Sequence, residues 1–149
     1  MKILVPVDGS EYALEALRVA IDFVKTKGAS IALISVVPYI GGMDDHEISP
    51  ARRERHMDGL QKRADEIVKQ ACAVVDAEQV AASCTKHTVT SVSAAEAISD
   101  YAETEKIDLI VMGSRGLSPS ARFKIGSVAS QVAKYSPCSV YLVKLPSGD

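Results

Sequence analysis

The chain has 149 residues, a length that fits one domain with its own hydrophobic core. Apolar residues make up 47% and charged residues 24%, as in ordinary globular proteins, and the net charge of −2 gives a nucleic-acid partner no bulk electrostatic support. No apolar run approaches the roughly 18 residues that span a bilayer, so we expect no membrane partner. The opening residues lack the segments of a signal peptide, and the three cysteines form no CxxC pair. We therefore expect a cytoplasmic protein with neither a disulfide framework nor a zinc site.

Apolar runs and helical periodicities alternate along the chain. The run over residues 2–7 predicts a buried parallel strand, and Ser10 is placed to cap a helix that ends at Gly28. A second strand is predicted over 30–37, a loop over 38–50 and a long helix from Ala51 to Val75. The remaining elements are strands over 79–89, 107–112 and 139–143 and helices over 94–101 and 126–135.

This strict alternation predicts an α/β fold of one domain, residues 1–149: an open five-stranded parallel sheet with right-handed crossovers and helices on both faces. In such sheets, ligands bind at the carboxyl ends of the strands where the winding direction reverses. The loops that follow the first and fourth predicted strands carry the most informative residues. They line one crevice only if these strands are neighbours, as in the strand order 3-2-1-4-5.

The most informative motif is Gly113-Ser-Arg-Gly116, which nine residues separate from Gly126-Ser127. It follows a predicted strand and precedes a predicted helix. Glycines let backbone N–H groups approach phosphate oxygens, and a helix N-terminus supplies free donors and partial positive charge. The same loop carries three cations: Arg115, Arg122 and Lys124. The motif therefore favours a nucleotide or another phosphorylated ligand; the alternative is a surface loop with a glycine turn and Ser127 as a plain N-cap.

With these residues the chain resembles the universal stress protein family over essentially its whole length. The resemblance rests on Val5-Pro-Val-Asp8, on residues 110–116, on Gly126-Ser127 and on the closing run over 138–143. The ATP-binding branch of that family carries Gly-2x-Gly-9x-Gly-Ser/Thr, and this sequence has that spacing in full. The resemblance implies a Rossmann-like sheet in the order 3-2-1-4-5. One departure is that Ser91 and Ser93 stand where the family often has Gly and Pro.

The resemblance also implies where a nucleotide would lie. The adenine would lie beside Pro6, Val7 and the backbone of Val36, and Asp8 would lie near the ribose. The ribose and phosphates would be surrounded by residues of the glycine loop and the next helix: Met112, Gly113, Arg115, Gly116, Gly126, Ser127 and Val128. The implied ligand is ATP with Mg²⁺.

Several of these residues also have a purely structural interpretation. Asp8 can be a turn aspartate before a helix, and Arg115 an exposed loop cation. The run Asp44-Asp45-His46-Glu47 has the composition of a metal site but no second ligand group at a recognisable spacing, which favours a solvated loop. We interpret the charged run Arg52–Asp58, with His56, as a solvated helix face and the cysteines as packing residues.

The favoured function is a cytoplasmic stress-response protein that binds ATP and acts as a nucleotide-dependent regulator. Any ATP hydrolysis would be slow, because Gly126 is followed by Ser127 and not by the lysine of a P-loop, and no base to activate water is evident. The alternatives are an enzyme of the adenine nucleotide α-hydrolase type, a flavin or other cofactor carrier, and an interaction module without ligand.

The last predicted strand, Ser139–Val143, would form an apolar edge of the sheet, and such an edge tends to find a partner. The family resemblance implies a two-fold homodimer through this strand, antiparallel to its mate.

Overall fold

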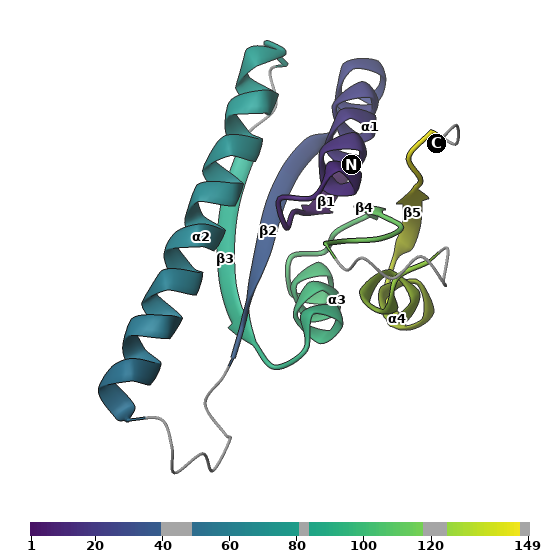
Figure 1. Ribbon diagram of the computed structural model, residues 1–149. Coiled ribbons are helices and arrows are strands. Elements are labelled where there is room, and N and C mark those ends of the chain that lie inside the picture. The colour runs from purple at the N-terminus through teal and green to yellow at the C-terminus, as the bar shows by residue number, and fades with distance from the viewer. Residues whose placement is uncertain (40–48, 81–83, 118–124, 147–149) are drawn as a thin grey trace.

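A computed structural model describes residues 1–39, 49–80, 84–117 and 125–146 (Figure 1). Within them, strands and helices alternate as the sequence predicts. The elements are β1 (Lys2–Pro6), α1 (Glu11–Lys27), β2 (Ser30–Pro38), α2 (Pro50–Ala77), β3 (Cys84–Ser91), α3 (Ala94–Thr104), β4 (Leu109–Gly113), α4 (Ser127–Tyr135) and β5 (Ser139–Val143).

The five strands form one parallel sheet in the order β3-β2-β1-β4-β5, which confirms the predicted fold class and strand order. Successive side chains of β1 point to opposite faces of the sheet. Ile3 and Val5 pack in a cluster with residues of α1 and α2, whereas Leu4 packs in a second cluster with residues of α3 and α4. The helices α1 and α2 therefore cover one face and α3 and α4 the other, as can be followed in Figure 1.

The hydrogen-bond register opens the sheet at its carboxyl edge. β1 pairs with β2 as far as Pro6, but its pairing with β4 ends at Leu4 opposite Ile110. Beyond that point Val7 donates to the carbonyl of Ile34 on β2, at 2.8 Å. Toward their carboxyl ends, β1 thus stays beside β2 and β4 stays beside β5. The neighbouring strands β1 and β4 therefore separate at the point where the winding direction of the sheet reverses.

Helix caps set the ends of the first helix as predicted. Ser10 Oγ accepts from the N–H of Ala13 at 3.1 Å, and Gly28 ends α1 in the left-handed conformation, with φ 67°. Among the described residues, no helix is long and apolar enough to cross a membrane.

The starts of two strands differ from the prediction, while the strand ends agree with it to within two residues. Gln79 does not begin a strand, because α2 runs to Ala77 and Gln79 turns back with φ 52° while its N–H donates to Asp76; β3 begins at Cys84. Ile107 precedes β4 because its N–H donates to the carbonyl of Ala102 and closes the end of α3.

Candidate functional site

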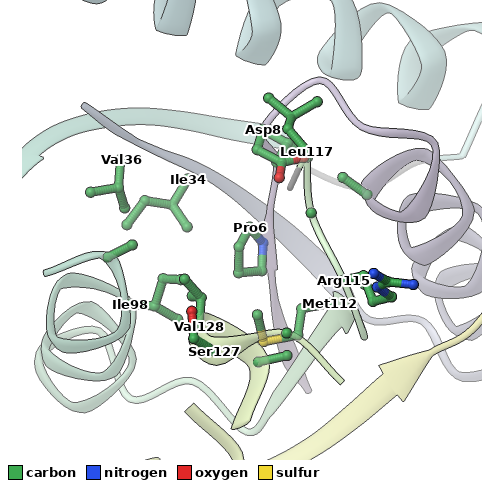
Figure 2. A pocket seen from close by; sticks show the side chains of 17 residues that line it. Pro6, Asp8, Ile34, Val36, Ile98, Met112, Arg115, Leu117, Ser127 and Val128 are labelled. Atoms are coloured by element: carbon green, nitrogen blue, oxygen red, sulfur yellow. The ribbon is translucent and has the colours of Figure 1, made fainter. Parts of the chain in front are cut away.

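A cavity of about 300 Å³ lies at the carboxyl edge, where β1 and β4 separate (Figure 2). All eleven residues singled out from the sequence line it: Pro6, Val7, Asp8, Val36, Met112, Gly113, Arg115, Gly116, Gly126, Ser127 and Val128. The fold thus brings together segments that are up to about 120 residues apart in the chain, from β1, β2, β4 and α4. That these residues bind a ligand stays a prediction.

Six further residues line the cavity that the sequence interpretation did not name: Ala13, Ile34, Ala94, Ile98, Leu117 and Ala129. Ile34 lies two positions before Val36 and therefore on the same face of β2, so strand periodicity alone could have found it. Ala94 and Ile98 of α3 could not be assigned to the cavity from the sequence. Their assignment depends on the packing of α3 beside β2 at the carboxyl edge, which no local sequence pattern indicates.

One side of the cavity is apolar. Pro6, Ile34 and Val36 from the two strands face Ile98 of α3 and Val128 of α4 (Figure 2). Hydrophobic walls of this kind, with few polar groups, are typical of sites for small molecules.

The position of Asp8 is compatible with both roles considered from the sequence, a turn residue before a helix and a ligand contact. Its Oδ1 accepts from the N–H of Ser10 at 2.9 Å, the hydrogen bond of a turn aspartate before a helix. Its Oδ2 lies against the glycine loop, 2.7 Å from the place that a Cβ on Gly116 would occupy. The turn role and a ligand role therefore use different oxygens, and Gly116 leaves room for the second.

The first glycine of the motif is required by the fold. A Cβ on Gly113 would lie 2.6 Å from Cβ and 2.9 Å from the carbonyl carbon of Tyr12, so the end of β4 packs directly on the first turn of α1. Backbone atoms cannot yield as a flexible side chain can. Gly113 thus lets the start of the loop lie directly against the first turn of α1.

Two backbone hydrogen bonds anchor the glycine loop at Ser114. The N–H of Ser114 donates to the carbonyl of Val143 on β5 at 2.8 Å, and the Ser114 carbonyl accepts from the N–H of Gly126, at the other end of the loop, at 2.7 Å. The start of α4 is thereby held beside the end of β4. This places the partial positive charge of a helix N-terminus at the cavity.

The N-cap of α4 is Gly126, and Ser127 is the first helical residue, so the interpretation of Ser127 as the N-cap is wrong. The backbone of Gly126 has the extended conformation of a cap, and α4 has no side-chain cap hydrogen bond. The Ser127 hydroxyl is consequently not engaged in capping and lines the cavity. A Cβ on Gly126 would meet its neighbours at ordinary distances of 3.5 and 3.6 Å.

Arg115 lines the cavity from one side, and its guanidinium points away from the apolar residues in Figure 2. The other two loop cations, Arg122 and Lys124, lie outside the described residues, as does the acidic run 44–47. In the described ranges, no group of three or more His, Cys, Asp or Glu could hold a metal ion.

The departure at Ser91 and Ser93 is accommodated by side-chain hydrogen bonds. Ser93 caps α3 by accepting from the N–H of Glu96 at 3.2 Å, and Ser91 Oγ accepts from the N–H of Ser93 at 3.2 Å. Two serines thus make the turn that brings Ala94 to the cavity. Of the cysteines, Cys72 is buried and Cys138 is half-buried against the α3 and α4 cluster, as expected of packing residues.

The model of one protein family, described as the universal stress protein family, matches residues 1–144. The chain belongs to this family. A universal stress protein of Methanocaldococcus jannaschii is 34% identical, with 97% of this chain and 82% of that protein covered. The solved structure of the universal stress protein UspA from Lactobacillus plantarum is 26% identical and has a TM-score of 0.81, with 96% of this chain and 97% of that chain covered.

Three more distant structures with this fold hold adenine nucleotides. A universal stress protein family protein of Arabidopsis thaliana has AMP bound; it is 19% identical, with a TM-score of 0.69 over 99% of this chain and 93% of that chain. A universal stress protein in complex with cAMP and the one from Archaeoglobus fulgidus in complex with dAMP are each 22% identical, with TM-scores of 0.66. They cover 96% and 95% of this chain, and 96% of each of those chains.

The contact at Gly113 predicts a loss of stability on substitution. We expect Gly113→Ala to lower the free energy of unfolding by about 1–3 kcal/mol, because the added methyl group overlaps Tyr12. Urea unfolding followed by circular dichroism would measure the change. Gly126→Ala is the matched control and should cost at most about 1 kcal/mol, the difference between the two residues as N-caps. Equal losses in the two variants would contradict the role given to Gly113.

Proposed function

We propose that this universal stress protein binds ATP together with Mg²⁺ in the carboxyl-edge cavity and acts in the cytoplasm as a nucleotide-dependent regulator of the stress response. One observation carries the proposal: a single cavity combines an apolar wall, a carboxylate oxygen not used in the turn, and a glycine loop that ends at a helix N-terminus. These are the three surfaces that a base, a ribose and a phosphate chain need. The adenine nucleotides held by structures of the same fold support it.

Each part of the nucleotide has residues that would receive it. The adenine would lie against the wall formed by Pro6, Ile34, Val36 and Ile98, and Oδ2 of Asp8 would accept from the ribose hydroxyls. The phosphates would lie at the start of α4. There the Ser127 hydroxyl and the first N–H groups of the helix can donate to phosphate oxygens.

A metal ion would arrive bound to the phosphates of the nucleotide, because the described lining offers it few ligands of its own. Asp8 is the one carboxylate that lines the cavity among the described residues, and one of its two oxygens, Oδ1, accepts a hydrogen bond from the N–H of Ser10. Mg²⁺ is commonly bound through substrate phosphates and one or two protein groups, with water in its remaining positions. Bound in this way, it would neutralise phosphate charge.

The residues that line the cavity suit nucleotide binding better than ATP hydrolysis. Oδ1 of Asp8 is held by the turn, and the motif has no P-loop lysine after Gly126. We therefore propose at most slow hydrolysis. Release of AMP and pyrophosphate from ATP at enzymatic rates would instead favour the α-hydrolase alternative.

The decisive variant is Gly126→Glu. The position has room for a Cβ, so the fold should survive, while a carboxylate at the start of α4 would occupy the phosphate site and repel the ligand. We expect calorimetric ATP binding by the wild-type protein and none by the variant, with unchanged circular dichroism. Ser130→Glu, which adds the same charge on the exposed side of α4, is the control and should bind normally.

Two results would overturn the assignment. Unchanged ATP affinity in Gly126→Glu would mean that the glycine loop does not hold the phosphates. No nucleotide released from the denatured wild-type protein, together with no heat on adding ATP, would leave the chain as an interaction module without ligand.

We also propose a homodimer through β5. This strand pairs with β4 along one edge only, and its other edge ends the sheet. Tyr141, in the middle of the strand, is 46% exposed and packs edge-on against Phe23 of α1, with ring centroids 6.2 Å apart. An apolar edge strand with an exposed aromatic residue is a favourable surface for pairing with a second copy.

Sedimentation equilibrium tests the dimer. We expect a dimeric mass at micromolar concentration, and a monomeric mass for Tyr141→Asp, because the two-fold axis would bring like charges together at the paired edge. Tyr135→Asp, which adds the same charge on the exposed last residue of α4 and outside β5, is the control and should stay dimeric. A monomeric wild-type protein would refute the proposal.

A further inference from the structure

The helix α2 extends past the carboxyl end of β3 (Figure 1). Its buried residues all lie between Ala64 and Val75, and none of the residues 50–63 is buried. This first half of the helix holds five of the 17 lysines and arginines of the chain but only two of the 19 acids. A chain with a net charge of −2 thus carries a projecting helical segment with a net charge of +3.

Four cations of this segment form a stripe along one face: Arg52, Arg55, Lys62 and Arg63, called here the basic stripe. Their spacing puts them on the side of the helix opposite the buried residues Ala64, Val68 and Ala71. All four side chains are exposed, and none has an ion-pair partner among the described residues. The acids at 44, 45 and 47, which precede the helix in the sequence, lie outside those residues.

Gly59 lies in the middle of the basic stripe and has no role in the fold. Its backbone is helical, and a Cβ added there would meet nothing within 4 Å. Glycine is among the least favourable residues in a helix interior because it loses the most backbone freedom. Here it leaves a gap in the layer of side chains between the pair Arg52 and Arg55 and the pair Lys62 and Arg63, which are about 13 Å apart along the axis.

We infer that the basic stripe is a docking surface for an acidic helix of a partner protein, which crosses α2 at Gly59. The gap lets a rod-like element approach the backbone of α2 closely, and the cation pairs on either side then meet carboxylates of the partner. Guanidinium groups suit this contact because they bind carboxylates through two parallel hydrogen bonds.

Two other anionic partners fit the surface less well. A membrane surface requires the apolar face of a basic helix, and the apolar face of α2 packs on the sheet from Ala64 onward. A nucleic acid would meet a narrow ridge of cations on a protein that is acidic overall, and phosphate contacts do not need the gap at Gly59.

The test uses the full chain and a fluorescein-labelled, alanine-based helical peptide of about 20 residues with glutamate at every fourth position. Anisotropy at about 50 mM salt, where exposed charges are weakly screened, measures the affinity. We expect binding by the wild-type protein and a loss of at least about tenfold when Arg52, Arg55, Lys62 and Arg63 are changed to Gln. The control changes four exposed cations elsewhere, Arg18, Lys27, Lys106 and Lys134, to Gln and should keep the affinity.

A second variant tests the gap without changing the charge. Gly59→Leu should weaken peptide binding at least about fivefold by steric exclusion. It should not lower the midpoint of thermal unfolding, since leucine is a better helix former than glycine. Ala73→Leu places the same side chain farther along the same exposed face and should bind as the wild type does.

Several outcomes would overturn the inference. Absence of peptide binding would exclude the docking surface, and an equal loss in the control cation variant would show attraction by bulk charge only. Normal binding by Gly59→Leu would exclude close approach at the gap. Binding of an oligouridine RNA or of phosphatidylserine vesicles in place of the peptide would assign the stripe to another class of partner.

Discussion

The separation of β1 from β4 is the constraint on which the cavity depends. β1 is the central strand, and its residues Ile3, Leu4 and Val5 are 0% exposed, with helices on both sides. β1 pairs on one side with β2, which continues the winding toward β3, and on the other with β4, where the winding reverses. Helices leave the two strands on opposite faces, so nothing fills the space between their carboxyl ends. The topology of the sheet therefore creates a cavity at this place whatever residues line it.

The fold could be predicted because its determinants are periodic and local. The buried strands are short runs of branched apolar residues, and Ser10 and Gly28 mark the ends of α1 by their capping chemistry. The boundaries that failed depended on other information. Gln79 lies in a left-handed turn that no residue type announces, and the N–H of Ile107 is used by the end of α3 before β4 begins.

The candidate site was predictable in its polar part and less so in its apolar part. Asp8 and the glycine loop stand out because each directly follows a run of apolar residues, and the glycines recur at a fixed spacing. Ile98 and Ala94 look like ordinary positions of an amphipathic helix, and only the packing of α3 beside β2 turns them toward the cavity. Polar ligand contacts leave local patterns in a sequence, whereas apolar walls share the pattern of the core.

The fold needs glycine at some of the described positions and not at others. Gly113 is forced by the contact with Tyr12, whereas a Cβ on Gly116 would meet only the end of the Asp8 side chain, which can move aside. Gly126 has ordinary space for a Cβ, and Gly59 has nothing around it, so neither contact nor a left-handed backbone accounts for glycine at these two positions. The N-cap position favours glycine over alanine at Gly126, while no internal contact favours it at Gly59; at both places the bare backbone leaves room for a group from outside the chain. At Gly126 this group would be a phosphate at the start of α4, and at Gly59 it would be a partner on the exposed face of α2. At both positions a backbone without a side chain lies beside positive charge. The charge comes from the helix terminus at Gly126 and from arginine and lysine side chains at Gly59.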